Sequence, residues 1–324
     1  MPFYKPNNEC PVCRQKSKFK FIKDHKNRYG NFSLFQCQQC LVQFWLPFEN
    51  QANREWYEKI DPYNIKKNNQ PRKLHHYHKK FIKLHQKEII KTRILDLGCG
   101  TGEFIARLEK LGAEAWGTDI DQPAIEIAKK FNLKNVYSLP IEDFFKKELP
   151  LFNYITIFEV LEHIGNPLEI LEKSKNLLTP KGKIVISLPS RKRIFPNLSE
   201  WDYPLHHLSR WSPEALKKIL SRAGYKNIKI RIFGKLHYLY ELSLQLIIPK
   251  KLVAKTKKEI STDKERPKES KNNKIRQQIL KSIYPPARLI AVFLIPYLLT
   301  ALLFLPTVIF FPKTGSLYVE AEKN

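Results

Sequence analysis

The chain has 324 residues, of which 43% are hydrophobic, so it is long and apolar enough to bury a core and is not disordered as a whole. Its net charge is +26, and the excess lies on the flanks: residues 1–91 hold 19 basic and 7 acidic side chains, and residues 250–288 hold 13 and 4. Flanking positive charge favours an anionic partner, either phospholipid head groups or nucleic acid. A lysine-rich solvated surface is the alternative.

Residues 1–49 contain two Cys-x-x-Cys pairs, and residues 1–30 contain no apolar run of the length that a secretory signal needs. Paired cysteines of this spacing indicate metal ligation in a reducing compartment rather than disulfides, so we expect a cytoplasmic protein. Four thiolates complete a tetrahedral zinc site and leave no open position, which predicts a structural zinc ribbon. Its ligands are Cys10, Cys13, Cys37 and Cys40. Alternating aromatic residues between the pairs predict short strands.

Residues 50–91 are predicted to form a basic helical linker. This segment includes the sequence His75-His76-x-His78. Three histidines this close together are compatible with a metal site, but we expect them to lie on a solvated helix face.

A short apolar strand at residues 93–97 runs directly into glycines and then into a helical pattern from Glu103 to Leu111. Glycines let the backbone turn tightly and let a ligand approach without interference from a Cβ atom. An acid precedes the first glycine, giving Asp96-x-Gly98-x-Gly100-x-Gly102. This stretch resembles motif I of class I S-adenosylmethionine (SAM) methyltransferases.

The resemblance extends over most of residues 92–235. Further matching segments are a second strand at Ala115–Asp119, a third at Asn135–Ser138, a fourth with its exit at Phe152–His163, a fifth at Leu178–Pro189 and a substrate-side loop at Pro204–Ser212. It implies an α/β fold with a Rossmann-like seven-stranded sheet, SAM as cofactor and methyl transfer as the activity.

The same resemblance assigns cofactor contacts. The glycine turn would hold the methionine end of SAM, and Asp119 would accept hydrogen bonds from the ribose hydroxyls. Asn153 stands where these families usually carry Asp, and Leu139 where an acid often faces the adenine, so Glu142 or Asp143 would take that role. The expected cofactor-binding residues are Asp96, Gly98, Cys99, Gly100, Gly102, Asp119, Ile120, Glu142 and Phe158.

Glu159, Glu162 and His163 have the i, i+3, i+4 spacing that places three side chains on one side if the segment is helical. The pattern resembles the E-x-x-E-H of ubiquinone-biosynthesis O-methyltransferases, which implies a divalent cation such as magnesium. Otherwise His163 acts as a base or orients the acceptor, or it forms a structural pair with a glutamate. The expected catalytic residues are His163, Glu162, His206 and His207.

The segment Leu289–Phe311 has 23 residues without a charge, which is long enough for one membrane crossing, but Pro296 and Pro306 divide it. Residues 315–324 alternate like a strand and resemble the closing seventh strand of the methyltransferase sheet, paired with a sixth strand at Asn227–Phe233. Residues 236–314 would then be a basic, apolar helical insertion between these strands. We expect residues 285–312 to attach the protein to the inner face of the membrane as a hairpin; a buried helical pair is the alternative.

These observations predict a SAM-dependent O-methyltransferase whose acceptor is presented at the membrane. A lipid-linked or envelope glycan, a sugar or a quinol precursor would fit. Two alternatives remain: an RNA methyltransferase that uses the basic flanks, and a non-catalytic adaptor that keeps the SAM-binding fold. We do not expect a nucleic-acid partner, because no clear stacking motif accompanies the basic residues.

Overall fold

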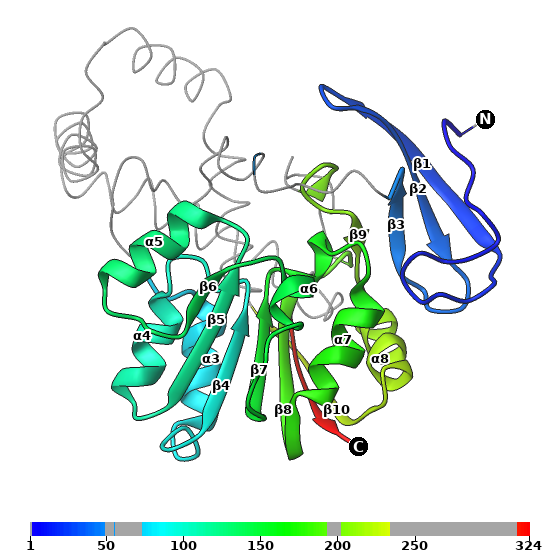
Figure 1. Cartoon of the computed structure of the whole chain (residues 1–324). Helices are drawn as coiled ribbons and strands as arrows, with labels where there is room; N and C mark the ends of the chain where they lie inside the picture. Colours follow the sequence, from blue (N-terminus) through cyan, green and yellow to red (C-terminus); the bar gives the residue numbers. More distant parts are fainter. Residues whose placement is uncertain (1, 49–54, 56–72, 193–201, 234–315) are drawn as a thin grey trace, which may run out of the picture. The chain divides into compact units, whose positions relative to one another are not determined.

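The computed structural model describes residues 2–48, 55, 73–192, 202–233 and 316–324 (Figure 1). The chain divides into one unit of Met1–Arg231 with Ser316–Asn324 and a second unit of Ile232–Gly315. The predicted insertion, with its membrane-attaching residues 285–312, lies outside the described residues. In the described part, no helix combines the length and apolarity that a membrane crossing requires.

The larger sheet has seven strands in the order β10-β11-β8-β7-β4-β5-β6. Neighbours from β8 to β6 run parallel, and β11 is antiparallel to β8. The strands are β4 (Arg93–Leu97), β5 (Glu114–Asp119), β6 (Val136–Ser138), β7 (Phe152–Phe158), β8 (Leu178–Pro189), β10 (Tyr225–Phe233) and β11 (Ser316–Lys323). The predicted α/β fold is confirmed, and the last strand lies between β8 and β10.

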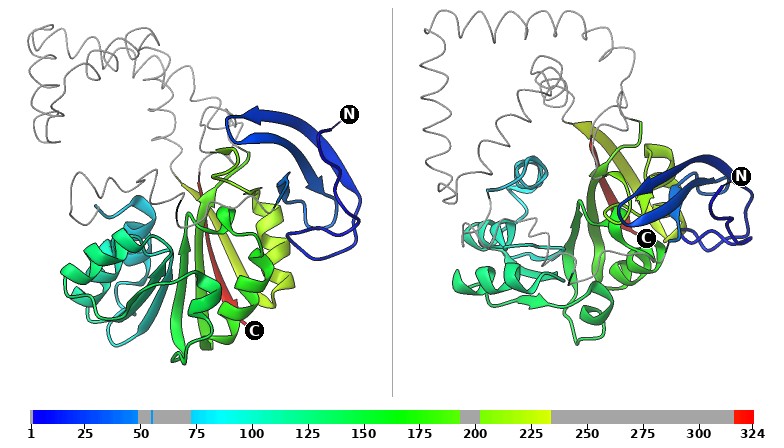
Figure 2. Two further views of the ribbon diagram at one scale, coloured as in Figure 1. Left: turned by 45° about the horizontal axis from the view of Figure 1, so that its top comes forward. Right: turned by 90° about the horizontal axis from the view of Figure 1, so that it is seen from above.

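Helices flank this sheet (Figures 1 and 2). They are α3 (His76–His85), α4 (Glu103–Lys110), α5 (Gln122–Lys130), α6 (Ile141–Phe144), α7 (Pro167–Asn176) and α8 (Pro213–Arg222), with a 3-10 turn, η1 (Leu161–His163). Local sequence explains several starts. Asp121 caps α5 by accepting the N–H of Ala124, and Ser212 caps α8 by accepting the N–H of Ala215. Apolar faces of α4 and α8 are buried, as their helical periodicity requires.

A second sheet contains the N-terminal strands β1 (Phe19–Asn27), β2 (Gly30–Cys37) and β3 (Gln43–Leu46). They form antiparallel pairs in which Phe35 lies opposite Phe21 and Phe44. The fourth strand of this sheet is β9 (Ser209–Arg210), which comes from the segment between β8 and α8. The N-terminal module therefore shares a sheet with a distant part of the chain, which the sequence pattern did not indicate.

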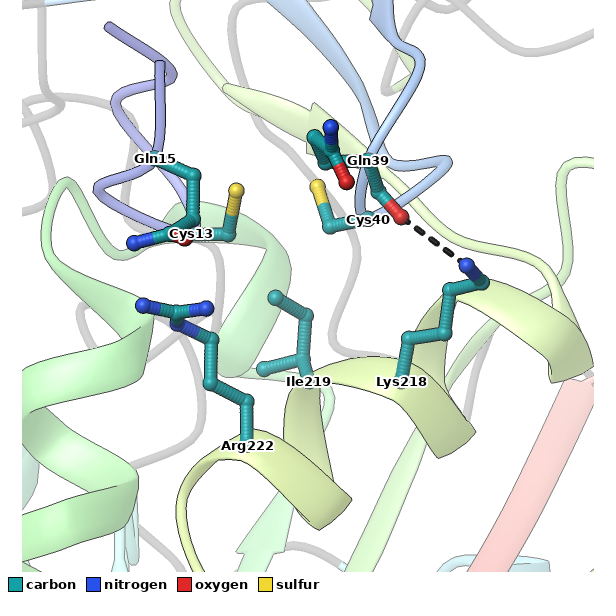
Figure 3. Close-up of a pocket in the computed structure, with 7 residues that line it drawn as sticks. All are labelled: Cys13, Gln15, Gln39, Cys40, Lys218, Ile219 and Arg222. Atoms are coloured by element: carbon teal, nitrogen blue, oxygen red, sulfur yellow. Dashed lines mark hydrogen bonds between the residues drawn. The ribbon is translucent and has the colours of Figure 1, made fainter. Parts of the chain in front are cut away.

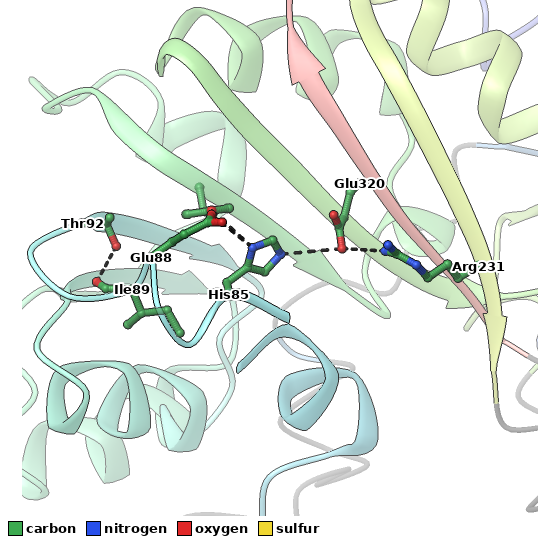
Figure 4. A network of polar contacts seen from close by, with 7 residues as sticks. His85, Glu88, Ile89, Thr92, Arg231 and Glu320 are labelled. Atoms are coloured by element: carbon green, nitrogen blue, oxygen red, sulfur yellow. Dashed lines mark hydrogen bonds and ion pairs between the residues drawn. The ribbon is translucent and has the colours of Figure 1, made fainter. Parts of the chain in front are cut away.

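The end of α3 is joined to the last strand through His85, which is 5% exposed. Its Nδ1 lies 3.6 Å from Glu88 and its Nε2 lies 3.6 Å from Glu320 on β11. Glu320 also forms an ion pair of 2.9 Å with Arg231 on β10 (Figure 4). Burial raises the pKa of Tyr154, whose hydroxyl also donates to Glu88. These contacts fix the predicted linker helix against the closing strands of the sheet.

Candidate active site and cysteine centre

The turn between β4 and α4 is built from glycines. Gly98 has a φ of 86°, in the left-handed region, and a Cβ atom there would lie 2.3 Å from Cγ2 of Val160. The N–H groups of Gly98 and Cys99 both donate to the carbonyl oxygen of Thr118, at 2.8 and 3.0 Å, which fastens the turn to the neighbouring strand β5. Glycine is required at position 98, because the backbone conformation and the space both exclude a side chain.

Asp119 is the last residue of β5, and its carboxylate is directed at this turn. Oδ2 accepts the N–H of Gly100 at 2.8 Å, and Oδ1 accepts the N–H of Asp121 at 2.9 Å. The side chain is 7% exposed. Burial raises the pKa of the Asp119 carboxyl, and the backbone hydrogen bonds from Asp121 and Gly100 oppose that rise. The acid and the glycine turn therefore lie in direct contact at the carboxyl edge of the parallel strands, where open α/β sheets bind ligands.

Asp96 lies one residue before the end of β4 and is fully enclosed. Its Oδ1 accepts a hydrogen bond of 2.6 Å from the Thr156 hydroxyl on β7. Burial raises the pKa of the Asp96 carboxyl to about 7, although the Thr156 hydrogen bond works in the opposite direction. This carboxyl therefore titrates near neutral pH rather than near its usual value of about 4.

The other residues predicted to contact the cofactor differ in how far their side chains are buried. Ile120 and Glu142 are half-buried, and Glu142 belongs to the short helix α6. Asp143, the alternative to Glu142, is exposed and pairs with Lys146 at 2.7 Å. Cys99 is buried, and burial raises the pKa of its thiol well above the ordinary value, so it is unsuited to act as a nucleophile.

Asn153, which departs from the family pattern, has a structural role. Its Oδ1 accepts the N–H of Arg93 at 2.9 Å and thereby holds the start of β4 against β7. Leu139 likewise contributes its backbone, since its carbonyl oxygen accepts the Thr118 hydroxyl at 2.7 Å.

Phe158 ends β7 within a cluster of aromatic rings and is 5% exposed. Its ring centroid lies 5.2 Å from that of Tyr77 and 5.6 Å from that of Phe104. His78 stacks on Phe104 at 4.6 Å and is only 6% exposed. The expectation that the three histidines at 75–78 lie on a solvated face is therefore wrong for His78. Its side of α3 packs on the sheet because the helix also buries Tyr77 and Phe81.

Three histidines lie together beyond the exit of β7, and we call His163, His206 and His207 the histidine cluster. The ring centroid of His163 lies 4.5 Å from that of His206 and 4.9 Å from that of His207. Nδ1 of His163 donates to the carbonyl oxygen of His206. Burial lowers the pKa of His163 well below its ordinary value, and the nearby His207 and His206 lower it further, whereas backbone hydrogen bonds oppose the shift.

Glu162 lies beside this cluster, and Asp202 supports it. Oε1 of Glu162 is 4.0 Å from Nε2 of His163 and 3.9 Å from Nε2 of His207. Nδ1 of His207 lies 3.4 Å from Oδ1 of Asp202. The four residues predicted as catalytic, which come from two separate segments, are thus brought together. Asp202 was not anticipated, because a single acid four residues before His206 carries no distinguishing pattern.

The predicted cation set of Glu159, Glu162 and His163 does not fit this geometry. Glu159 has a φ of 55° and precedes a single 3-10 turn, so the helical spacing on which the prediction rested is absent. Its Oε1 accepts a hydrogen bond from the Ser187 hydroxyl on β8. Within the described residues, the ligand groups that all lie within 4.8 Å of one another are the four cysteines and the histidine cluster. Neither Glu159 nor Glu162 belongs to these groups, although Oε1 of Glu162 lies within 4.0 Å of two of the three histidines.

The N-terminal sheet positions the segment that carries the histidine cluster. Trp45 on β3 donates its N–H to the carbonyl oxygen of Leu208, and Leu208 donates its own N–H to the carbonyl oxygen of Glu162, both at 3.0 Å. The hydroxyl of Ser209 also donates to that Glu162 carbonyl at 3.4 Å. Main-chain hydrogen bonds therefore run from the N-terminal sheet through Leu208 to Glu162.

Tyr203 provides a second connection between the N-terminal sheet and the segment that carries His206 and His207. Its ring stacks on His25 of β1 with centroids 3.9 Å apart, and its hydroxyl accepts a hydrogen bond of 3.2 Å from Lys23 Nζ. The amide of Asn27 donates to the carbonyl oxygen of Pro204, the next residue. The loop before the cluster is thus held by side chains of β1.

The four paired cysteines converge at one end of the N-terminal sheet. Sγ of Cys10 lies 3.9 Å from Sγ of Cys40, and Sγ of Cys13 lies 3.9 Å from Sγ of Cys37. Sulfurs bound about 2.3 Å from a tetrahedral zinc ion lie about 3.8 Å apart, so the cysteines fit zinc closely. Hydrogen bonding among the thiols raises the pKa of Cys10 and lowers that of Cys37.

A small pocket opens beside this centre (Figure 3). Lys218 and Arg222 reach it from α8, and Lys218 Nζ donates to the carbonyl oxygen of Gln39 at 3.0 Å. The pocket is lined by Cys13, Gln15, Gln39, Cys40, Lys218, Ile219 and Arg222. Two positive side chains therefore lie near thiolates that carry negative charge when they bind a metal.

Comparison with known proteins gives one family. The model of a methyltransferase domain matches residues 48–230, more than half of the chain. A ubiquinone biosynthesis O-methyltransferase of Actinobacillus pleuropneumoniae is 33% identical over 108 residues, which cover 31% of this chain and 46% of that protein. The enzyme of the same name from Idiomarina loihiensis is 26% identical over 142 residues, covering 41% and 56%. The chain spans about half the length of the curated relatives it matches.

Among solved structures, a SAM-dependent methyltransferase from Archaeoglobus fulgidus aligns with a TM-score of 0.46 and 21% identity, covering 76% of this chain and 92% of that one.

Proposed function

Because the chain belongs to the family of methyltransferase domains, we propose that it transfers the methyl group of SAM to an oxygen of a small-molecule acceptor. The observation that carries this proposal is the hydrogen bond from Gly100 to Asp119, which joins the glycine turn to the acid at the end of the next strand. Both lie at the edge of the sheet where this fold class binds nucleotide-like ligands.

The proposed cofactor contacts follow from the donors and acceptors of this edge. Each carboxylate oxygen has two lone pairs, and Asp119 uses its two oxygens for Gly100 and Asp121, so it retains capacity to accept from the two ribose hydroxyls. The backbone of residues 98–102 would hold the methionine end, beside Asp96. Ile120 and Glu142, half-buried beyond β5 and in α6, would contact the adenine side. Phe158 and the buried Cys99 would support the turn from within.

SAM supplies a methyl carbon already activated by its sulfonium, so the protein's main task is to hold the acceptor in line with that carbon. Such positioning contributes on the order of 7–11 kcal/mol to a reaction barrier. An oxygen acceptor must also lose a proton. Glu162 and His163 follow shortly after β7, on the same edge of the sheet as the glycine turn, and His206 and His207 pack against His163 from the segment between β8 and β9. We assign proton removal to this group.

His163 is the central member of that group. Since its Nδ1 donates to a carbonyl oxygen, which only accepts, the proton of a neutral ring lies on Nδ1 and Nε2 is the nitrogen that can receive another. Burial lowers the pKa of His163, which favours the neutral ring that can accept a proton. His206 and His207 would orient the acceptor hydroxyl.

The identity of the acceptor is proposed from the relatives and the sequence. The curated relatives are named ubiquinone biosynthesis O-methyltransferases, which supports a small oxygen acceptor such as a quinol precursor. The basic flanks and the apolar residues 285–312 support presentation of that acceptor, or of a lipid-linked glycan, at an anionic membrane surface.

Two measurements test the proposal. Calorimetry with SAM and the full-length protein should show binding that is weakened in Asp119→Asn and retained in Glu126→Gln, whose side chain is exposed on α5. Incubation of the protein with methyl-labelled SAM and a native membrane extract should then label the lipid or small-molecule fraction. Label in the RNA fraction instead would favour the nucleic-acid alternative, and absence of SAM binding would favour the adaptor.

A further inference from the structure

We propose that the histidine cluster, joined by Glu162, binds one divalent transition-metal ion at a site distinct from the four cysteines. One nitrogen from each of the three rings lies within 4.8 Å of the others. Oε1 of Glu162 lies 3.9 Å from Nε2 of His207 and 4.0 Å from Nε2 of His163. Ligand atoms about 2.1 Å from a tetrahedral zinc ion are about 3.4 Å apart, so the two Glu162 contacts would close by about half an ångström, and the imidazole nitrogens by up to about 1.4 Å, on binding.

The orientation of two rings supports ligation through Nε2. Histidines that bind metals usually direct the other ring nitrogen at a carbonyl or carboxylate oxygen, which fixes the tautomer and the ring plane. His163 directs Nδ1 at the carbonyl oxygen of His206, and His207 has Nδ1 3.4 Å from Oδ1 of Asp202. Both Nε2 atoms face Glu162.

The ligand set favours zinc, or another late transition metal, over magnesium. Imidazole nitrogens suit zinc, iron and nickel, whereas magnesium prefers a nearly complete set of oxygens. The group offers three imidazoles and one carboxylate. A second carboxylate is not part of it, because that of Glu159 accepts the Ser187 hydroxyl. This site therefore differs in ligands and in metal preference from a cation site made of Glu159, Glu162 and His163.

The side chains of this site are buried or half-buried, and backbone hydrogen bonds hold Glu162 in position. Glu162 is 2% exposed and His207 is 7% exposed, and a carboxylate in such surroundings is stabilised by a neighbouring positive charge. The Glu162 carbonyl is held by Leu208 and Ser209, so its position is set by the N-terminal sheet. One consequence rests on the proposed function and changes one of its roles: an ion here would occupy Nε2 of His163, so the charge of the ion, rather than that nitrogen, would help an acceptor hydroxyl lose its proton.

The test is the metal content of the full-length protein, purified, incubated with zinc and dialysed. Mass spectrometry of the metals should give two zinc ions per chain. The variants His206→Gln and His207→Gln should each give one, because the cysteine centre keeps its own ion. That remaining ion also reports that the N-terminal sheet, which includes β9, is still folded. The control His76→Gln changes an exposed histidine of α3 and should keep both ions.

Competition identifies the metal and separates this inference from the proposed function. A hundredfold excess of magnesium should not displace the second zinc ion. One zinc ion per chain in the unaltered protein, or two in both cluster variants, would overturn the inference. SAM binding is measured on the same samples. If SAM binds but only one ion is found, the metal site is contradicted and the proposed function is not. If two ions are found but SAM does not bind, the proposed methyl transfer is contradicted and the metal site is not.

Discussion

The N–H of Gly100 donates to Oδ2 of Asp119 across 19 positions of sequence, at 2.8 Å. The turn after one parallel strand is thus attached to the acid that ends the next. A ligand bound at this edge meets backbone groups and a carboxylate that are already held in place, which reduces the conformational entropy lost on binding.

Replacing Asp119 by asparagine tests this arrangement. The amide retains one oxygen that can accept from Gly100 but removes the charge and half of the acceptor capacity. Hydrogen bonds to charged groups contribute about 1.5–3 kcal/mol each, so we expect the SAM dissociation constant to rise by about ten- to a hundredfold. Titration calorimetry measures the change. An unaltered affinity, with Glu126→Gln also unaltered, would contradict the assignment of Asp119 to the ribose.

Asp96 should make stability depend on pH in an unusual direction for a carboxyl. Its folded-state pKa is raised from 3.8 to about 7, so between these values the folded protein retains a proton that the unfolded chain has released. The contribution of this carboxyl to the free energy of unfolding is complete below pH 4. It decreases as the pH rises to 7, by up to about 4 kcal/mol. Urea unfolding at several pH values should show this loss in the native protein and a flatter profile in Asp96→Asn. Equal slopes in both proteins would contradict it.

Tyr203 should affect catalysis without affecting the cofactor. The change Tyr203→Ala removes the stacking on His25 and the contact with Lys23, and so loosens the loop that leads to His206. Aromatic pairs contribute about 0.5–1.5 kcal/mol beyond burial, and we expect kcat to fall about tenfold with the SAM dissociation constant unchanged. Tyr203→Phe keeps the ring and serves as the matched control. A parallel loss of SAM affinity would indicate general unfolding instead.

Membrane attachment is a prediction from the sequence alone. Deleting residues 285–312 should move the protein from the membrane pellet to the supernatant, since the charge-free apolar run is removed and the basic segment before it remains. Fractionation of cells that express each form measures the partition. The full-length protein should also leave the pellet partly at high salt, because screening weakens attraction to anionic lipids. Full-length protein found in the supernatant at low salt would end the prediction.

The parts of the fold that sequence predicts best are those whose signal is local. The turn at residues 98–102 was predicted because its glycines and the preceding strand are contiguous, and β11 because its alternation is intact within a few residues. The pairing of β11 with β10 was expected from the family resemblance. Cys10, Cys13, Cys37 and Cys40 were predicted as a group because two short spacings restrict the geometry of four ligands.

The features that escaped prediction depend on contacts between distant segments. His163 and His206 are 43 positions apart, and their hydrogen bond depends on the path of the loop after β8. The grouping of Glu159 with His163 depended on a helical segment, whereas the backbone there makes one 3-10 turn. His78 lies on the buried side of α3 with Tyr77 and Phe81, so the polarity of its side chain does not by itself place it at the surface.

The pairing of Gln43 and Phe44 on β3 with Arg210 and Ser209 on β9 has a consequence for how such proteins diversify. Because the N-terminal sheet shares a ladder with the methyltransferase domain, we expect that it is not exchanged between homologues as an appended module is. Substitutions in β3 or β9 should then be accompanied by compensating substitutions in the other strand.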